Sequence, residues 1–235
     1  MPRWKQLVHS LEEIKFIDTK LSDFAVKTNI YTGVEGTEEV FKQLSGSNTS
    51  IVHLATHGFY FTSEAAAKND YFINEQKNNN SSPGIRSGVL FSGANTAWTG
   101  YDIPSTSEDG ILNSDEILGM DLSGTDLLVL SACQSALGDI QSDGSYGIQR
   151  SFKIAGVNSI IMSLWEVDDE STKIMMMSFY NYLSKGLSIK HSFDKAVNEV
   201  KKAYAEREKS LGKRGIPKSS RYDSSYYWTS FVLLD

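Results

Sequence analysis

Three short, almost continuous apolar runs constrain this fold more than any other feature of the chain. They are residues 50–55 (SIVHLA), 126–132 (DLLVLSA) and 157–164 (VNSIIMSL). Runs of this length without polar alternation are typical of strands buried on both faces of a parallel sheet. Helical patterns separate the runs along the chain, as they do in α/β proteins. The sequence therefore predicts an α/β fold with a mostly parallel central sheet flanked by helices.

Periodicity and turn residues predict the remaining elements. Helices are expected at residues 4–24, 37–44, 113–118, 145–155, 170–185 and 188–207, and further strands at 25–31, 86–95 and 226–234. Ser114 is the expected N-cap of the helix at 113–118. Residues 68–82 and 138–147 are expected to form loops. No repeat of solenoid length is present, so a single domain over residues 1–235 is expected, with the abrupt start of a domain excised from a longer protein.

Composition excludes several classes of protein. The net charge is −6 and no basic face is evident, so we expect no nucleic-acid partner. No window approaches the roughly 18 apolar residues of a membrane span, and residues 1–20 lack the pattern of a signal peptide. Cys133 is the only cysteine, which precludes an intramolecular disulfide. A reducing, cytoplasmic setting is therefore expected.

The apolar runs end in residues that carry chemistry. Ligands bind at the carboxyl ends of parallel strands, where this sequence places His57, Cys133 and the segment 165–169. A lone cysteine is usually a small buried apolar residue. Cys133, however, lies among small residues in SACQSA, and a histidine at a neighbouring strand end would supply the base that a thiolate needs. We therefore predict that His57 and Cys133 form a catalytic dyad.

Two histidines compete for the role of base. His53 falls inside its strand, which fits a hydrogen-bonded core residue better. His57 falls past the strand beside Gly58, whose N–H would form an oxyanion hole together with the N–H of Cys133. A metal site of His53, His57 and Cys133 is the rival reading, but four residues along a strand separate side chains by more than about 10 Å. We therefore expect neither a metal nor a cofactor.

Several longer motifs of the chain resemble those of a known family. The motifs HLATHG at residues 53–58 and LSACQS at 130–135 are similar to those of the CHAT family of caspase-like proteins. The resemblance extends over residues 10–235 through the segments SGVLFSGAN at 87–95, DGIL at 109–112, SLWEVDD at 163–169 and WTSF at 228–231. Histidine precedes cysteine, which is the caspase order. The resemblance implies a caspase-like three-layer sandwich and a cysteine endopeptidase with His57 as base and Cys133 as nucleophile.

A further similarity, to the caspase-like peptidase separase, bears on specificity. In separase an acidic residue of a comparable Leu-Trp-x-Val segment lines the pocket for the residue before the scissile bond. By motif position Asp169 matches best and Asp168 next, and Trp165 belongs to the same segment. The resemblance implies cleavage after Arg or Lys, which a carboxylate would pair with. Helix capping by Asp168 or Asp169 is the alternative. Asp115 and Glu116 would shape the site or simply start a helix.

Regulation is also implied by the resemblance. CHAT proteins are often fused or paired with repeat domains or sensor proteins, and they serve in bacterial defence or regulated cell death. A latent peptidase with a protein substrate and a regulatory repeat or sensor partner is therefore expected. Two alternatives stay open: a catalytically silent scaffold of the same fold that binds a partner, and a thiol hydrolase that acts on a non-peptide acyl substrate.

Overall fold

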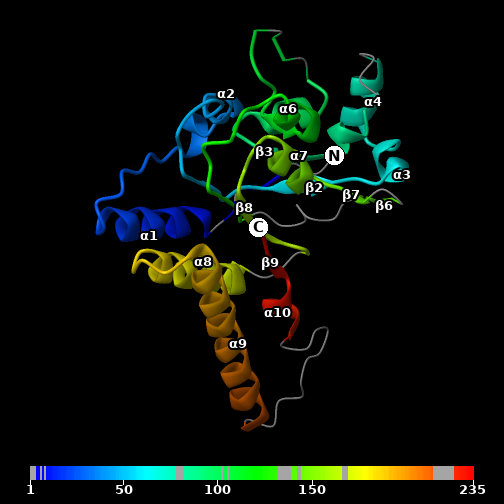
Figure 1. Ribbon diagram of the computed structural model, residues 1–235. Helices are drawn as coiled ribbons and strands as arrows, with labels where there is room; N and C mark the ends of the chain where they lie inside the picture. The colour runs from blue at the N-terminus through cyan, green and yellow to red at the C-terminus, as the bar shows by residue number, and fades with distance from the viewer. Residues whose placement is uncertain are drawn as a thin grey trace. The chain divides into compact units, whose positions relative to one another are not determined.

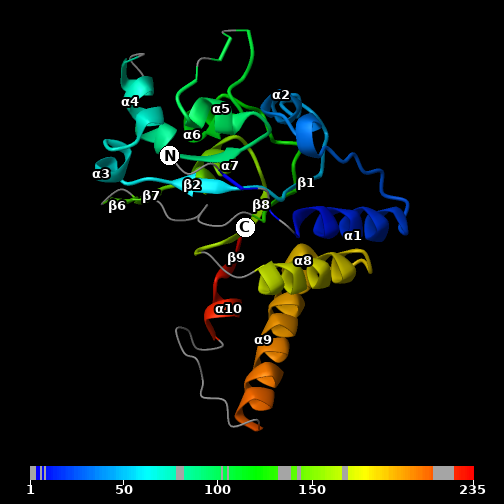
Figure 2. The same ribbon diagram turned by 180° about the vertical axis from the view of Figure 1, so that it is seen from behind.

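The structure is a computed structural model. It describes residues 4–5, 7, 9–77, 82–101, 103–104, 106–131, 139–141, 144–165, 169–213 and 225–235. The chain divides into two compact units (Figures 1 and 2). Unit 1 consists of Met1–Leu7, Tyr31–Trp165 and Leu234–Asp235, and unit 2 of Val8–Ile30 and Glu166–Leu233.

Unit 1 holds most of the strands. They are β1 (Ile51–Leu54), β2 (Gly58–Tyr60), β3 (Ser87–Leu90), β4 (Ile111–Asn113), β5 (Leu127–Leu130), β6 (Asp139–Gln141), β7 (Gly144–Tyr146) and β8 (Ser159–Ser163). Its helices are α2 (Glu38–Lys42), α3 (Ser63–Ala66), α4 (Asp70–Lys77), α5 (Ala94–Trp98), α6 (Ser114–Leu118) and α7 (Ile148–Ile154), with the 3₁₀ turns η1 (Gly33–Glu35) and η2 (Pro83–Arg86).

The central sheet has the strand order β1-β5-β8-β9, in which β9 is Phe231–Leu234. The pairs β1–β5 and β5–β8 are parallel. Every residue of β5 is buried, because it lies between two neighbours, whereas burial alternates along β1 at the end of the order. The predicted α/β class, with a mostly parallel central sheet flanked by helices as in a caspase-like sandwich, is confirmed.

A second sheet, with the order β2-β3-β4, is antiparallel throughout. β2 contributes Phe59 to an aromatic cluster with Phe72 of α4 and Trp98 of α5. All three side chains are almost fully buried. Trp4, from the N-terminal segment, packs against the same cluster. Strands β6 and β7 form a separate antiparallel hairpin within the stretch where a loop was predicted.

Unit 2 is mainly helical. Its helices are α1 (Ser10–Ser22), α8 (Asp169–Leu183), α9 (Ile189–Lys213) and α10 (Ser225–Thr229). Helix α1 lies alongside α8 in both views, and Lys173 bonds to Glu12 between them, with 2.6 Å between Nζ and Oε1 (Figures 1 and 2). Tyr204 of α9 stacks on Tyr227 of α10, with 4.2 Å between the ring centroids.

Several local predictions were wrong. Residues 25–31 form no strand. Of the strand predicted at 226–234, residues 226–229 belong to α10 instead, and only 231–234 form β9. The predicted loop at 68–82 contains α4, whose buried Tyr71 and Phe72 join the aromatic cluster. Asn113, not Ser114, caps α6, and its Oδ1 accepts hydrogen bonds from the amides of Asp115 and Glu116 in a capping box.

Membrane insertion by a helix finds no support in the described part of the chain. None of the helices there combines the length and the apolar character that crossing a bilayer requires.

Candidate active site

Leu54, Leu130 and Met162 lie in one row across the central sheet. Leu54 is the Cα partner of Leu130 in the β1–β5 pair, and Leu130 is the partner of Met162 in the β5–β8 pair. Three positions after each of these residues the sequence has a residue that was predicted for the site. These residues are His57, Cys133 and Trp165. The three strands run in the same direction, so all three continuations leave the sheet at one edge.

His57 lies on the short connection between two sheets. The chain leaves the central sheet after Leu54 and enters β2 of the second sheet at Gly58. Two hydrogen bonds to Leu90, the last residue of β3, hold this connection. The hydroxyl of Thr56 donates to the carbonyl of Leu90, and the amide of Leu90 donates to the carbonyl of His57 at 2.9 Å. The bonds to β3 therefore fix the backbone of His57, which carries the imidazole.

The imidazole of His57 is half-buried against the N-terminal segment. Its Nε2 lies 2.6 Å from the carbonyl oxygen of Lys5, and its ring centroid is 5.2 Å from that of Trp4. A carbonyl oxygen only accepts hydrogen bonds, so Nε2 carries the proton. In the neutral ring Nδ1 then holds the lone pair and is the nitrogen that can act as a base.

The orientation of the Gly58 amide follows from the ladder between β2 and β3. The bonds from Leu90 to His57 and from Phe61 to Arg86 mark the hydrogen-bonded pairs of this antiparallel register. Gly58 stands at the intervening position, opposite Val89. Amides at such positions point away from the partner strand. The N–H of Gly58 is thus directed to the side of β2 that does not face β3.

Cys133 and Asp168 lie outside the described residues, as does the amide that was predicted for the oxyanion hole together with Gly58. The last described residue before Cys133 is Ser131, whose amide donates to the carbonyl of Leu54 at 3.0 Å. Trp165, half-buried, ends the long middle segment of unit 1, and Asp169 is the first residue of α8 in unit 2.

The other histidines lie elsewhere. His53 is half-buried in the middle of β1, on the face opposite Val52 and Leu54. His9 pairs with Glu12 at 3.8 Å on an exposed helix end, and Nδ1 of His191 lies 2.9 Å from the hydroxyl of Ser188. The end of β1 at Leu54 separates His53 from His57.

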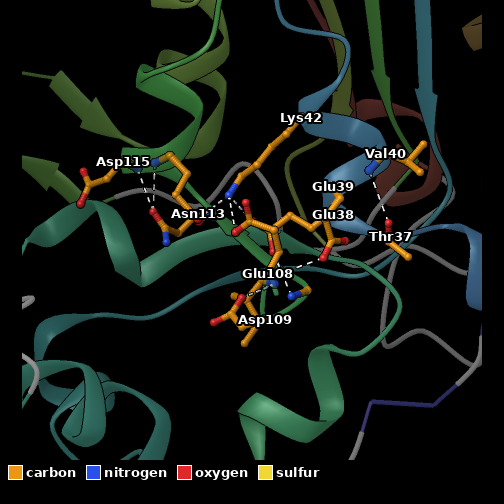
Figure 3. A network of polar contacts seen from close by, with 12 residues as sticks. Thr37, Glu38, Glu39, Val40, Lys42, Glu108, Asp109, Asn113 and Asp115 are labelled. Atoms are coloured by element: carbon orange, nitrogen blue, oxygen red, sulfur yellow. Dashed lines mark hydrogen bonds and ion pairs between the residues drawn. The ribbon is translucent and has the colours of Figure 1, made fainter. Parts of the chain in front are cut away.

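A polar network centred on Lys42 forms a second candidate site (Figure 3). The Nζ atom of Lys42 lies 2.7 Å from a carboxylate oxygen of Glu38, 2.7 Å from one of Glu108 and 2.9 Å from one of Glu116. Glu38 also accepts a hydrogen bond of 2.9 Å from the amide of Gly110. The network therefore joins α2, α6 and the loop that leads into β4.

The charges of this network depend on one another. Burial raises the pKa of Glu38 to about 8, against the hydrogen bond from Lys42. Burial alone would lower the pKa of Lys42, but its hydrogen bonds to Glu108, Glu38 and Glu116 raise it instead. These three carboxylates have the spacing of metal ligands within the described residues, but the ammonium of Lys42 lies among them and serves as their counter-ion.

Asp115 and Glu116 have structural roles in the described chain. Glu116 closes the capping box of α6 by accepting from the amide of Asn113 at 2.9 Å, and it binds Lys42. Asp115 lies against Gly84, where a side chain would collide with its carboxylate. Of the two roles that the sequence left open for this pair, helix initiation is the one that these contacts support.

Sequence reasoning missed the groups that surround His57 and the Lys42 network. The partner of the imidazole is the backbone carbonyl of Lys5, an atom that every residue possesses, so no residue type signals it. Lys42 and Glu38 are one helical turn apart, a spacing that indicates an ion pair. The other two carboxylates come from distant parts of the sequence, and no local pattern links them.

Comparisons with known proteins bear on the whole chain. A family model described as the CHAT domain matches residues 2–234, and so covers both units. Tetratricopeptide repeat protein 28 of Mus musculus is 32% identical over 95 residues, which are 40% of this chain and 4% of that protein. The protein of the same name from Homo sapiens is 27% identical over 95 residues, with the same coverage. The match therefore spans only a small part of either relative.

Proposed function

Because the chain belongs to the CHAT domain family, a caspase-like family, we propose that it is a cysteine endopeptidase with Cys133 as nucleophile and His57 as base. The observation that carries the proposal is the shared row of Leu54 and Leu130. His57 and Cys133 follow these two partners after equal intervals on neighbouring parallel strands. Equal continuations from one row are what a dyad across two strand ends requires.

The proposed reaction is acyl transfer to a thiol. Nδ1 of His57 takes the proton of the Cys133 thiol, and the thiolate attacks the carbonyl carbon of the scissile peptide bond. The amides of Gly58 and Cys133 donate to the oxyanion of the tetrahedral intermediate. The imidazolium then protonates the departing amine, which leaves a thioester. Water, deprotonated by His57, hydrolyses the thioester and restores the thiol.

For specificity we propose a preference for Arg or Lys before the scissile bond. The support is the sequence segment of Trp165, Asp168 and Asp169, which follows the strand next to that of Cys133. A carboxylate in that pocket would form a charge-assisted pair with a basic side chain and would reject an acidic one. Asp169 is the first choice for this role and Asp168 the second.

We also propose that the peptidase is latent until a repeat-containing region or a sensor protein acts on it. Both matched relatives carry tetratricopeptide repeats in their names, and the matched stretch is a small part of each. Control of this kind suits a peptidase of a defence or regulated cell-death pathway, in which uncontrolled cleavage would be harmful.

The test uses fluorogenic peptides that vary at the residue before the cleaved bond, with Cys133→Ala as the matched control. Cleavage after Arg or Lys that disappears in Cys133→Ala supports the dyad. If Asp169→Ala still cleaves peptides but no longer prefers Arg or Lys, that result supports the pocket. Cleavage that persists in Cys133→Ala contradicts the assignment of the nucleophile. Turnover of acyl esters but of no peptide would instead identify a thiol hydrolase, and silence towards both libraries with a slowly alkylated Cys133 would favour a scaffold.

A further inference from the structure

The side chain of Asn95 holds the backbone of Trp4 at both of its polar atoms. The amide of Trp4 donates to Oδ1 of Asn95 at 2.8 Å, and Nδ2 of Asn95 donates to the carbonyl of Trp4 at 3.0 Å. A carboxamide that bonds an N–H and a C=O of one residue replaces the two bonds that a neighbouring strand would make. One side chain from α5 thereby fixes a residue more than ninety positions away.

The ring of Trp4 provides a second anchor from the same helix. Its centroid lies 5.4 Å from that of Trp98 in an edge arrangement. Trp98 belongs to the buried aromatic cluster, where it also contacts Phe59 at 5.3 Å and stacks on Tyr71 at 5.5 Å. Helix α5 is thus held rigidly in the core of unit 1, and it presents both Asn95 and Trp98 to the N-terminal segment.

These two anchors determine where the next carbonyl lies. Lys5 follows Trp4 directly, and its carbonyl oxygen is the acceptor 2.6 Å from Nε2 of His57. The ring of Trp4 packs against the same imidazole. The histidine is therefore bounded by the N-terminal segment on one side and by the β3 bonds to its backbone on the other.

We propose that Asn95 is a positioning residue for the general base. It acts through Trp4 and the Lys5 carbonyl, which keep His57 in the tautomer with the proton on Nε2 and leave Nδ1 for the thiol of Cys133. The carbonyl dipole also stabilises the imidazolium that forms after proton transfer, the role that a carboxylate plays in other catalytic triads. This inference rests on the proposed function for the statements that His57 is the base and Cys133 the nucleophile.

The tautomer can be measured without any substrate. The full chain is labelled with ¹⁵N-histidine, and two-bond ¹⁵N–¹H correlation spectra are recorded at a pH where the ring is neutral. The signal of His57 is assigned among the four histidines with His57→Gln. We expect the Nε2–H pattern in the wild type and a shift towards a mixture of both tautomers in Asn95→Ala.

Two further variants separate positioning from general loosening of the structure. Asn95→Asp keeps the acceptor for the Trp4 amide but loses the donor to its carbonyl, so it should move the tautomer ratio part of the way, and it serves if Asn95→Ala does not fold. Asn158→Ala is the matched control, because that amide bonds to Asp126 at 3.1 Å away from the histidine. It should leave the His57 spectrum unchanged.

Activity provides the second readout. With a cleavable peptide, Asn95→Ala should lower kcat about tenfold and change KM little, because a misplaced base affects proton transfer rather than binding. A Nδ1–H tautomer in the wild type, or an unchanged tautomer in folded Asn95→Ala and Asn95→Asp, would overturn the inference. An Asn95-dependent tautomer in a protein whose Cys133 is alkylated at the same rate in the wild type and in His57→Ala would retain the positioning contact and reject the peptidase, so the two failures are distinguishable.

Discussion

The amide of Ser131 donates a hydrogen bond to the carbonyl oxygen of Leu54, with 3.0 Å between the two atoms. This bond joins the end of β5 to the end of β1. From there each strand continues towards a predicted catalytic residue. Beyond it, the position of His57 depends on the connection to β2. In the sequence, His57 follows Leu54 by three positions and Cys133 follows Ser131 by two.

Alkylation of Cys133 tests whether the two residues meet. Since it is the only cysteine, one iodoacetamide adduct in the mass spectrum reports its rate without ambiguity. His57→Ala should slow alkylation at pH 7 about tenfold, because a nearby imidazolium stabilises the thiolate. His53→Ala is the matched control and should leave the rate unchanged. Equal alkylation rates in the wild type and His57→Ala would show that His57 does not act on the thiol of Cys133.

The hydroxyl of Thr56 should contribute to the stability of the turn that carries His57. Thr56→Val keeps the shape of the side chain but removes its hydrogen bond to the carbonyl of Leu90. We expect a loss of about 1 kcal/mol in the free energy of unfolding, measured by urea denaturation. Thr56→Ser retains the hydroxyl and should lose less. If the serine variant is the weaker of the two, packing of the methyl group rather than the hydrogen bond stabilises the turn.

Lys42→Met should expose a cation site that the lysine fills in the wild type. The variant leaves the carboxylates of Glu38, Glu108 and Glu116 facing one another, with ligand oxygens within 4.8 Å. We expect unfolding to become easier by about 2–3 kcal/mol, between the values for exposed and buried ion pairs. Millimolar Ca²⁺ should restore part of the loss in the variant and have no effect on the wild type.

A matched control for this variant is Lys68→Met, which removes an exposed pair with Glu64. That change should cost no more than about 0.5 kcal/mol. Similar losses in the two lysine variants would mean that the Lys42 network contributes no more than a surface ion pair does.

Glu38 should make stability depend on pH in the neutral range. Its pKa is raised from the ordinary 4.5 to about 8 in the folded chain, so the folded state holds a proton that the unfolded state has lost. This contribution is fully present below pH 4.5 and is lost as the pH rises through about 8. Denaturation at pH 5.5, 7 and 8.5 should show the decline in the wild type and a weaker decline in Glu38→Gln.

Glu39→Gln controls for the other groups that titrate in this range. Glu39 is the neighbouring carboxylate, and its pKa is lowered by hydrogen bonds from its own backbone amide and from Thr37. A lowered pKa affects stability only at acidic pH, so this variant should keep the wild-type decline between pH 5.5 and 8.5. If Glu38→Gln keeps it as well, the buried carboxyl is not its source.

Gly110→Ala should disturb the loop that Glu38 binds. Gly110 has a φ of +81°, and an added Cβ would lie 2.6 Å from the amide nitrogen of Ala94. We expect a loss of at least about 2 kcal/mol from strain and collision together. Gly46→Ala is the matched control, with a φ of +73° and no atom within 4 Å of the added Cβ, and should cost about 1 kcal/mol. Calorimetric unfolding of both variants compares the two.

The central sheet could be predicted from the sequence because its strands are continuous apolar runs. β5 is buried along its whole length and β8 at every residue after Ser159, as such runs require. β1 is also mostly apolar, yet its burial alternates because it has a strand neighbour on one side only in the described sheet. Helix α4 was missed because a polar stretch hides Tyr71 and Phe72, and only the tertiary cluster gives these two side chains a reason to be buried.

The strand end that carries His57 could be predicted from the sequence, but the contacts that support it could not. His57 and Gly58 follow β1 as the apolar run indicated, and the Gly58 amide points away from β3. The contribution of Asn95 depends on a bond to the backbone of Trp4. Backbone atoms carry no sequence signal, so contacts of this kind become visible only when the chain is folded.

The position of His57 between two sheets has a mechanical consequence. The central sheet carries the strand that leads to Cys133, while β3 of the second sheet holds the backbone of His57. The two residues of the proposed dyad therefore follow from different sheets, which residues 55–57 connect. A small displacement of one sheet relative to the other would change the separation between the proposed base and the proposed nucleophile while leaving the hydrogen bonds within both sheets intact.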